Sequence, residues 1–468
     1  MTAEPGTVLV WFRDDLRVAD NPALRAALDR RGPVIAVYVL DEESPGIRPL
    51  GGAGRWWLHH SLASLASSLA DLGVALVLRR GPAAHEVAAV AEAAGVGAVM
   101  WNRRYGAPER AVDDALQARL SARGLLVETF AAALLFEPGT ILTRDGQPYS
   151  VFTPFWRACA SRPTPRRPLS RPEPAPRRTG LDGTSSLGLD DLRLLPDRPD
   201  WATGLAAAWE PGEASAHQAV RSFVRDRLAA YPTDREIPST AGTSRLSPRL
   251  RWGELSPHQV WHAVADAQRH RPDVGQGVAD VLTELGWREF AWHTLRSFPD
   301  LATRNWRSDF DGFPWPPLRP DLLRAWQQGR AGVALVDAGM RELWRTGWMH
   351  NRVRMVTASF LTKNLLIDWR RGEEWFWDTL VDADAASNPF NWQWVAGSGA
   401  DAAPYFRVFN PDRQAQRFDP DGLYVRANIA EWGADAYPAP VVDLGRTRAE
   451  ALAAHDTLRR RPPQVRPH

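Results

Sequence analysis

The sequence of 468 residues is poor in the side chains that make disulfides, thiolate metal sites and lysine-rich surfaces, with one cysteine (Cys159) and one lysine (Lys363). A single cysteine excludes a disulfide framework and a metal site built from several thiolates. No run approaches the 18 apolar residues of a membrane span, and the N-terminal residues lack the basic start of a secretory signal. We therefore expect a cytoplasmic protein with no metal and no membrane association.

The charge balance is nearly even, because 57 basic and 55 acidic residues leave a formal net charge of +2. Any binding of nucleic acid must then depend on a local basic patch rather than on the field of the whole protein. Hydrophobic residues make up 44% and charged residues 24%, close to globular averages, so a large core is expected. The length predicts two or three domains.

Tryptophan is abundant: the chain has 22, of which 17 follow residue 200. A large helical core can absorb many of them, but each buried indole N–H needs a partner. The concentration in one region favours aromatic stacking platforms or electron transfer as functions of that region.

Residues 1–135 alternate apolar runs with helical patterns. The expected strands are Thr7–Phe12, Val34–Leu40, Ala75–Leu78, Ala98–Trp101 and Leu126–Phe130, with helices over Arg55–Leu72, Ala84–Ala94 and Glu109–Arg123 between them. Such alternation predicts an α/β domain with a doubly wound parallel sheet. The Gly-x-Gly-x-x-Gly fingerprint of dinucleotide binding does not follow the first strand.

Residues 136–200 are predicted to be an interdomain linker, since the stretch from residue 161 is rich in proline and arginine. Its arginines are interpreted as solvated, with DNA contact as the less favoured alternative. Residues 201–468 are predicted to form an all-α domain. The helical patterns there cover Ala214–Ala230, Pro257–Arg269, Val278–Arg296, Pro320–Gln328, Val333–Arg345, Trp348–Trp369 and Glu373–Leu380.

A series of ordered motifs carries a resemblance to a known family. These are WFRDDLR and ADNPAL near the start, then TSRLS (243–247), GELSP (253–257), ELGWREF (284–290), TGWMHNRVRM (346–355), LLIDWR (365–370), DADAASN (382–388), WQW (392–394) and DAAPYFRVFNP (401–411). Together they resemble the DNA photolyase/cryptochrome family over nearly the whole chain, most closely the bacterial class I enzymes that repair cyclobutane pyrimidine dimers. The resemblance implies an N-terminal antenna domain and a C-terminal helical domain that binds FAD.

The motifs also make chemical sense as a flavin site. Hydroxyl groups just before a helix suit a pyrophosphate, although a plain capping sequence would look the same, and Asp382 with Asp384 is equally typical of a helix cap. The resemblance implies FAD contacts from Tyr231, Thr243, Ser244, Arg245, Leu246, Ser247, Glu284, Arg288, Asn351, Arg354, Asp382, Ala383, Asp384 and Asn388. Asn388 matches the amide that faces flavin N5 in photolyases; the sequence departs from many relatives directly after it, at Pro389-Phe390.

Three tryptophans match an electron relay of the family. Trp306, Trp369 and Trp392 stand at the positions that carry electrons from the surface to the flavin. Any one of them alone is more often a core residue, but the match at all three positions favours the relay.

The resemblance also implies a lesion pocket formed by Glu284, Trp287, Asn351, Met355 and Trp394. Glu284, Trp287 and Arg288 share a helix face by spacing, and a plain Glu284–Arg288 ion pair is the alternative from the residues alone. The expected DNA contacts are Arg235, Glu284, Trp287, Arg288, Asn351, Arg352, Trp394, Arg407 and Gln414. The pair His350-Asn351 lacks the second histidine of (6-4) photolyases, which favours cyclobutane dimers.

These matches predict a monomeric, light-driven repair enzyme whose partner is DNA carrying cyclobutane pyrimidine dimers. The alternatives are a cryptochrome-type blue-light receptor that binds FAD without repair and a repair enzyme restricted to single strands. A second antenna chromophore is left open. Pro108 stands where folate-binding relatives have asparagine before the acid that Glu109 matches, which slightly favours a deazaflavin over methenyltetrahydrofolate.

Overall fold

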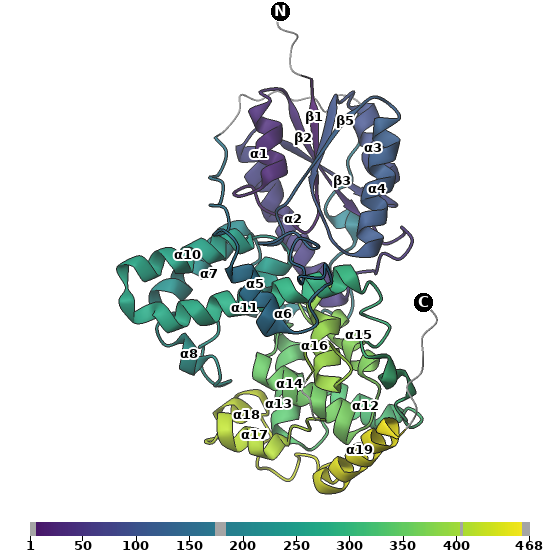
Figure 1. Cartoon of the computed structure of the whole chain (residues 1–468), viewed down its shortest axis with the longest axis vertical. Coiled ribbons are helices and arrows are strands. Elements are labelled where there is room, and N and C mark those ends of the chain that lie inside the picture. Colours follow the sequence, from purple (N-terminus) through teal and green to yellow (C-terminus); the bar gives the residue numbers. More distant parts are fainter. Residues whose placement is uncertain (1–5, 174–183, 403–405, 461–468) are drawn as a thin grey trace, which may run out of the picture. The chain divides into compact units, whose positions relative to one another are not determined.

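The computed structural model describes residues 6–173, 184–402 and 406–460. By compactness the chain forms two units (Figure 1). Unit 1 comprises residues 1–141, 159–226 and 244–273, and unit 2 comprises residues 142–158, 227–243 and 274–468. The linear division at residues 135 and 200 stays a prediction.

Unit 1 contains a five-stranded parallel sheet with the strand order β3-β2-β1-β4-β5. The strands are β1 (Val8–Phe12), β2 (Val34–Leu40), β3 (Ala75–Arg80), β4 (Ala98–Asn102) and β5 (Leu126–Phe130). Every residue of β1, β2 and β4 is buried, as expected for parallel strands that are covered on both faces and therefore read as continuous apolar runs. The order reverses between β1 and β4, so the doubly wound prediction is confirmed.

Helices cover both faces of this sheet (Figure 1). They are α1 (Pro22–Asp29), α2 (Gly52–Asp71), α3 (Ala83–Ala93) and α4 (Ala107–Ser121). Asn21 begins α1 by accepting a hydrogen bond from the backbone N–H of Leu24. Helices α3 and α4 pack against each other and bury Val87 and Leu116 against the sheet residues Trp11 and Trp101.

Unit 1 also contains helices that follow the sheet in the sequence: α6 (Thr203–Ala208), α7 (Glu213–Asp226), α9 (Ser247–Arg251) and α10 (Pro257–His270). Glu254 of the GELSP motif is fully buried and accepts hydrogen bonds from Trp57 Nε1 (2.9 Å) and Arg249 (2.9 Å). Gly253 has φ +66°, and a Cβ there would meet the Asp14 carbonyl oxygen at 2.1 Å. This motif is therefore a structural one.

Part of the predicted linker is held within unit 1. Arg166 forms an ion pair with the buried Asp20 (2.5 Å), and the backbone N–H of Leu169 donates to the same carboxylate (2.8 Å). His262 of α10 contacts the carbonyl oxygen of Pro165 at 2.9 Å. The solvated reading is wrong for Arg166, because a buried carboxylate needs a cationic partner. Residues 174–183 of the linker lie outside the described residues.

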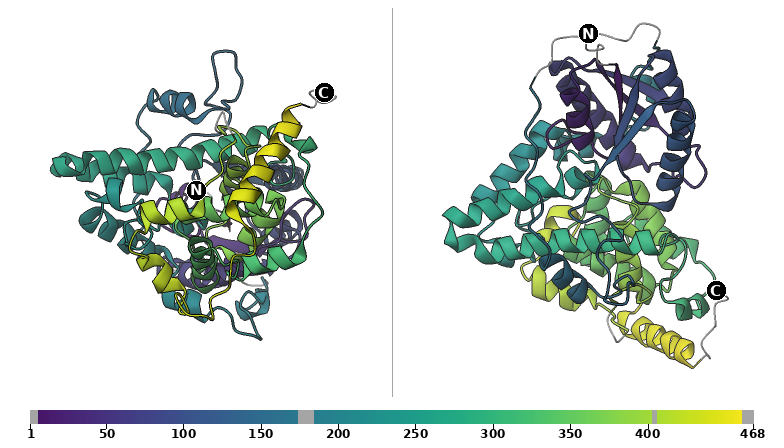
Figure 2. Two further views of the ribbon diagram at one scale, coloured as in Figure 1. Left: turned by 90° about the horizontal axis from the view of Figure 1, so that it is seen from below. Right: turned by 45° about the horizontal axis from the view of Figure 1, so that its top comes forward.

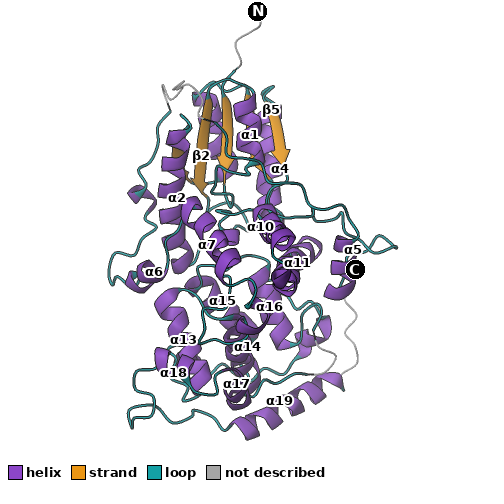
Figure 3. Cartoon of the chain, turned by 90° about the vertical axis from the view of Figure 1, so that its left-hand side faces the viewer, coloured by secondary structure: helices purple, strands orange, loops and turns teal. Residues whose placement is uncertain are grey.

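In the described residues of unit 2, the regular secondary structure is helical, and loops connect the helices (Figure 3). Its elements are α5 (Phe152–Ala160), α8 (Tyr231–Asp234), α11 (Gly275–Ser297), η3 (Ser308–Gly312), α12 (Pro320–Gln327), α13 (Ala334–Thr346), α14 (Asn351–Ser359), η4 (Phe360–Asn364), α15 (Trp369–Thr379), α16 (Ser387–Ala396), α17 (Pro411–Phe418), α18 (Leu423–Asn428) and α19 (Leu444–Arg459). The 23-residue α11 is visible as a long blue-green helix in both views of Figure 2. Helix α16 packs on α11, α14 and α15.

One expected helix is divided in the structure. The pattern Trp348–Trp369 predicts a single helix, but α14 ends at Ser359, a π-helical turn η4 follows, and α15 begins at Trp369. Leu366 has a left-handed backbone (φ +50°), and the side chain of Asp368 accepts from the N–H of Arg370 (3.0 Å) as the cap of α15. The prediction is wrong here because an apolar pattern does not reveal a turn between two buried helices. Among the described helices, none is both long and apolar enough to cross a membrane.

Candidate active site

Two of the predicted flavin contacts in unit 2, Arg354 and Asp382, form an ion pair. Arg354 of α14 binds both carboxylate oxygens of Asp382 (3.1 and 2.8 Å) and donates through Nε to the Met349 carbonyl oxygen (2.7 Å). The Asp382 side chain is 3% exposed, so its charge is compensated within the protein. Asp384, two residues on, accepts from the backbone N–H of Ala386 (2.8 Å) and so fixes the start of α16. Ala383 between them is half-buried.

Asn388 lies buried in the first turn of α16. Its Nδ2 donates to the backbone oxygen (3.1 Å) and to Oε1 (2.8 Å) of Glu373 in α15. Both donors are thereby committed, and Oδ1 is left as an acceptor for a ligand N–H. Pro389 is tolerated because a first-turn N–H has no partner inside the helix. The departure at Pro389-Phe390 therefore preserves the start of this helix.

Buried polar atoms near these groups fit a polar ligand such as FAD. His350 Nε2 and Trp392 Nε1 are both buried and have no hydrogen-bond partner within the described part of the chain. Such atoms carry a desolvation cost unless a ligand or water satisfies them. Burial lowers the pKa of His350 to about 4; the backbone of Arg235 opposes this shift, and the charges of Arg354 and Arg235 add to it. The neutral imidazole can therefore accept or donate at neutral pH.

The TSRLS segment spans the boundary between the units, with Thr243 in unit 2 and residues 244–247 in unit 1. Within unit 2, Arg227 donates to the Thr243 carbonyl oxygen (3.1 Å). Within unit 1, Ser247 is exposed at the first position of the short helix α9, Ser244 is half-buried and Leu246 is buried. Arg245 has φ +53° and lies over the ring of Trp209 (4.2 Å). The phosphate contacts predicted for this segment remain a prediction.

The three tryptophans predicted to form a relay differ in exposure. Trp392 and Trp369 are 2% and 1% exposed, and Trp306 is half-buried. Hydrogen bonds that involve neighbouring residues in the sequence link the segments that carry these tryptophans. Gln393 Oε1 accepts from the backbone N–H of Trp306 (2.8 Å), and Trp369 Nε1 donates to Asn305 Oδ1 (2.9 Å). This arrangement is consistent with a path from the interior to the surface.

Gly372 allows α15 to approach Trp392 closely. A Cβ at Gly372 would lie 2.0 Å from Cη2 of the Trp392 ring, which no side chain could accommodate without moving the indole. Since Trp369 lies one turn before Gly372 on the same helix, the glycine brings the helix that carries one predicted relay residue against the ring of another.

An aromatic stack supports Trp287 in the predicted lesion pocket. The ring of Phe152 in α5 is parallel to that of Trp287 in α11, with centroids 3.7 Å apart and 10° between the planes. Phe390 lies 6.4 Å from the Trp287 ring, so the departure after Asn388 places a ring in this pocket wall. Trp287 remains half-buried and retains exposed surface. Sequence reasoning did not identify Phe152, which falls within the predicted linker.

Glu284 has a different partner from the one that helical spacing suggests. Its Oε1 accepts from Arg235, an ion pair that joins α11 to the residue after α8. The i,i+4 pair with Arg288, the alternative interpretation of this spacing, is not among the ion pairs of the described residues; Arg288 lies 4.0 Å from Glu289. Burial lowers the pKa of Arg235, but the Glu284 carboxylate outweighs it and the net shift is upward. About 40% of the Glu284 side chain is exposed.

The remaining predicted contacts lie on α14, α16, α17 and the segment between the last two. Asn351 is exposed at the start of α14, and Met355 is half-buried one turn later. Trp394 of α16 is half-buried, donates through Nε1 to the Asp401 carbonyl oxygen (3.0 Å), and has the guanidinium of Arg407 at 5.8 Å. Gln414 lies half-buried on α17.

Positive charge gathers around Arg352. It forms an ion pair with Glu236 and lies over the ring of Phe418 (4.4 Å), as does Arg417 (4.9 Å). Burial lowers the pKa of Arg352, and the neighbouring charges of Arg417 and Arg235 lower it further. A cation destabilised by other cations favours a bound anion, so this surface suits phosphate groups.

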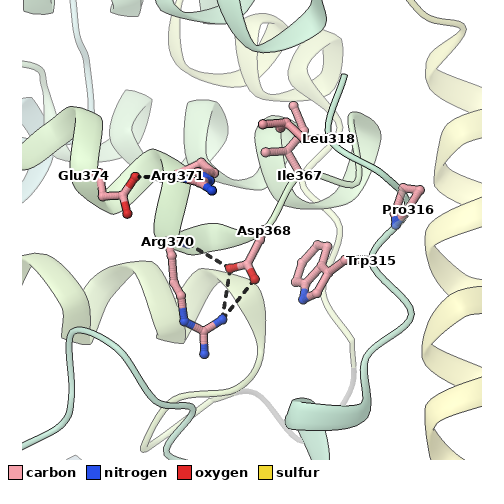
Figure 4. Close-up of a pocket in the computed structure, with 8 residues that line it drawn as sticks. All are labelled: Trp315, Pro316, Leu318, Ile367, Asp368, Arg370, Arg371 and Glu374. Carbon is pink, nitrogen blue, oxygen red and sulfur yellow. Dashed lines mark hydrogen bonds and ion pairs between the residues drawn. The ribbon is translucent and has the colours of Figure 1, made fainter. Parts of the chain in front are cut away.

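A separate surface pocket of about 290 Å³ lies at the start of α15 (Figure 4). Its lining residues are Trp315, Pro316, Leu318, Ile367, Asp368, Arg370, Arg371 and Glu374. Arg370 pairs with Asp368 (3.0 Å) and Arg371 with Glu374 (3.2 Å), so both guanidinium groups already have carboxylate partners. None of the predicted flavin or lesion contacts lines this pocket.

Comparison with known proteins supports the same assignment. Family models match residues 8–176 (DNA photolyase) and residues 281–434 (FAD binding domain of DNA photolyase). The chain is 45% identical to the deoxyribodipyrimidine photo-lyase of Agrobacterium fabrum over 98% of this chain and all of that protein. It is 36% identical to cryptochrome-1 of Arabidopsis thaliana, covering 96% of this chain and 70% of that protein.

The same holds for solved structures. A bacterial class III photolyase from Agrobacterium tumefaciens superimposes with a TM-score of 0.93 at 44% identity, covering 98% of this chain and 99% of that one. The expected class I subclass is therefore not confirmed, whereas the FAD cofactor and the two-part fold are supported. The chain belongs to the DNA photolyase/cryptochrome family.

Proposed function

We propose that this protein is a light-driven deoxyribodipyrimidine photo-lyase, similar in type to the class III enzyme, that splits cyclobutane pyrimidine dimers in DNA. The observation that carries the proposal is the lesion pocket of unit 2. A half-exposed Trp287 is stiffened by a parallel Phe152 ring and lies on the same helix as Glu284, which Arg235 holds in place. A rigid ring beside a fixed carboxyl group suits a flat, uncharged ligand with carbonyl groups.

The residues divide the work of binding the lesion. Trp287 and Trp394 present ring surface on which an extruded dimer can stack, as bases do on aromatic side chains. Arg235, Arg288, Arg352 and Arg407 provide the positive charge for the phosphates on either side. Glu284 hydrogen-bonds the pyrimidine carbonyl groups, with Asn351 and Met355 completing the wall.

The predicted flavin contacts hold FAD through Arg354, Asp382 and Asn388. FAD, when bound and reduced, would supply under light the electron that opens the cyclobutane ring and that then returns to the cofactor. The chain itself orients the cofactor, keeps an acceptor at Asn388 Oδ1, and provides Trp392, Trp369 and Trp306 as the path for reduction. We propose that the protein acts as a monomer.

A second pigment would lie in unit 1. At the edge where the strand order reverses, Trp11 Nε1 and Arg104 Nε are buried and lack hydrogen-bond partners within the described residues. Ligands of doubly wound sheets bind at this edge. We retain a deazaflavin as slightly favoured over methenyltetrahydrofolate, and an absorption spectrum of the purified protein distinguishes them by an additional band.

The second candidate function is a cryptochrome-type receptor, favoured by the 36% identity to cryptochrome-1 of Arabidopsis thaliana. The higher identity of 45% to a photo-lyase over full length favours repair.

The deciding experiment illuminates pre-reduced, FAD-loaded protein with DNA containing one thymine dimer and measures dimer loss. We expect repair in light and none in the dark, and no repair in light would support the receptor. Binding should weaken with salt at a slope of roughly −3 to −4 in log K against log salt if four arginine–phosphate contacts form.

A further inference from the structure

The single lysine of the chain is buried in unit 2, and none of the roles described above involves it. Lys363 is 1% exposed and lies in the π-helical turn η4. Burial of a lysine is rare and costly unless its nitrogen finds a partner, and burial lowers the pKa of Lys363 well below its ordinary value. The placement therefore needs a reason.

The nitrogen of Lys363 contacts two segments that carry lesion-pocket residues. Nζ donates to the Ala396 carbonyl oxygen (2.7 Å), at the last residue of α16, where carbonyl groups have no partner within the helix. The same nitrogen lies 3.2 Å from the centroid of the Phe406 ring. An amine or ammonium group favours both contacts, because a carbonyl oxygen and a ring face are both electron-rich.

These segments bear directly on the pocket. Trp394 lies two residues before Ala396, and Arg407 directly follows Phe406. The Arg407 guanidinium lies 5.8 Å from the Trp394 ring, so the two segments also meet at the proposed binding surface. Ser359, next to η4, accepts from the backbone N–H of Phe409 (3.1 Å), which fixes the other end of the second segment.

We infer that Lys363 is a positioning residue of the lesion pocket: from the π-helical turn it joins the end of α16 to residues 406–409 and thereby holds Trp394 and Arg407 in register. The inference rests on the proposed function. π-Helical turns insert an extra residue into a helix and recur at functional sites. Here the π-helical turn places Lys363 where its nitrogen can reach the C-terminal end of α16. A regular α-helix would direct the side chain elsewhere.

The test uses Lys363→Met, which keeps the length and apolar character of the side chain but removes the nitrogen. Thr362→Val is the matched control, because Thr362 is equally buried in the same turn and its hydroxyl bonds only the Ala358 carbonyl oxygen (2.8 Å) among the described contacts. Phe406→Leu is a second variant that removes the ring and leaves Lys363 in place, in case Lys363→Met does not fold.

The first measurement is amide hydrogen exchange of the FAD-loaded protein without DNA. Lys363→Met and Phe406→Leu should both speed exchange in residues 394–402 and 406–410, whereas Thr362→Val should not. The second measurement is affinity for dimer-containing DNA, which should fall roughly 2- to 30-fold in both variants with FAD content unchanged. The variant with both substitutions should lose less binding free energy than the sum of the losses in the two single variants.

Unchanged exchange in these segments, or unchanged affinity in both variants while the parent binds the dimer, would overturn the inference. A parent that neither binds nor splits dimers overturns the proposed function instead, and the exchange measurement separates the two failures because it requires no DNA.

Discussion

Two groups of tryptophans in the helical unit are held in opposite ways. Trp369 and Trp392 are almost fully buried, and the polar contacts around the proposed relay come from Asn305 and Gln393. Trp287 and Trp394 are half-buried and rest against Phe152 and Arg407. The first environment fixes the distance between rings and excludes water, whereas the second leaves ring surface for a ligand.

The difference shows that the number of tryptophans does not indicate their function. The environment of each ring determines it: a ring enclosed by protein can pass an electron or fill a core, whereas a ring with one face packed and the other exposed can bind a base. Four substitutions test the roles proposed for these tryptophans and for the polar groups of the site. They follow from the largest expected effect to the smallest.

Trp306→Phe should abolish photoreduction of oxidised FAD by an external reductant, because phenylalanine is far harder to oxidise than tryptophan. Repair by chemically pre-reduced enzyme should be nearly unchanged, since the lesion pocket is untouched. Flavin absorption under blue light measures the first and dimer loss the second. Trp432→Phe, at a 41% exposed position outside the relay, is the control. Loss of repair in the pre-reduced variant would refute the relay assignment.

Trp287→Ala should weaken binding of dimer-containing DNA by about 1–3 kcal/mol, the usual contribution of one stacked base. Trp287→Phe, which keeps a ring against Phe152, should recover much of that loss. Fluorescence anisotropy with labelled DNA measures both, and affinity for undamaged duplex serves as the baseline. If the alanine variant binds as tightly as the parent, Trp287 belongs with the core tryptophans.

His350→Asn should make stability less sensitive to acid. The pKa of His350 is lowered from 6.5 to about 4, so the folded protein holds the neutral ring. Its stabilising contribution is complete above pH 6.5 and is lost as the pH falls through 4; at pH 5 the loss is about 2 kcal/mol. Asparagine keeps the capping acceptor that Nδ1 offers to the Arg352 N–H (3.2 Å). Denaturant unfolding at pH 7.5 and pH 5 measures the change, and equal acid sensitivity of both proteins contradicts it.

Glu284→Gln should have the smallest effect, a fall in dimers split per absorbed photon well below the roughly hundredfold loss typical of a deleted donor in a dry site. Glutamine retains a hydrogen-bonding amide but loses the charge that Arg235 compensates. FAD content should be unchanged. A yield equal to that of the parent would reduce Glu284 to an ion-pair partner of Arg235.

Sequence reasoning predicted the features that local residue patterns encode, namely the strands and the helical second part. All five strands of the sheet were expected, because buried parallel strands read as apolar runs, and the helical second part followed from its periodicity. Asn388, Asp382 and Trp392 came from motif matches, and the structure places them on or beside α16.

What sequence reasoning missed depends on contacts distant in the chain. Phe152 contacts Trp287 at a separation of 135 residues in the sequence, and Arg235 pairs with Glu284 from another element, so neither pair can be predicted from residue spacing. The break before Trp369 depends on a left-handed Leu366, a conformation that residue type does not announce. The sequence shows that Lys363 is the one lysine of the chain, but not that its side chain is buried against Ala396 and Phe406.

Gly372 has a consequence for anyone who redesigns this protein. Its missing side chain is the room that the Trp392 ring occupies, so even alanine there would push the indole aside. Tunnelling rates fall steeply with distance, so a displacement too small to unfold the helix would still slow photoreduction. Helix propensity would favour alanine over glycine by about 1 kcal/mol in a helix interior, but forcing a buried ring aside costs roughly 1–3 kcal/mol. Any redesign for stability should therefore leave this position as glycine, which also preserves the ring spacing of the proposed relay.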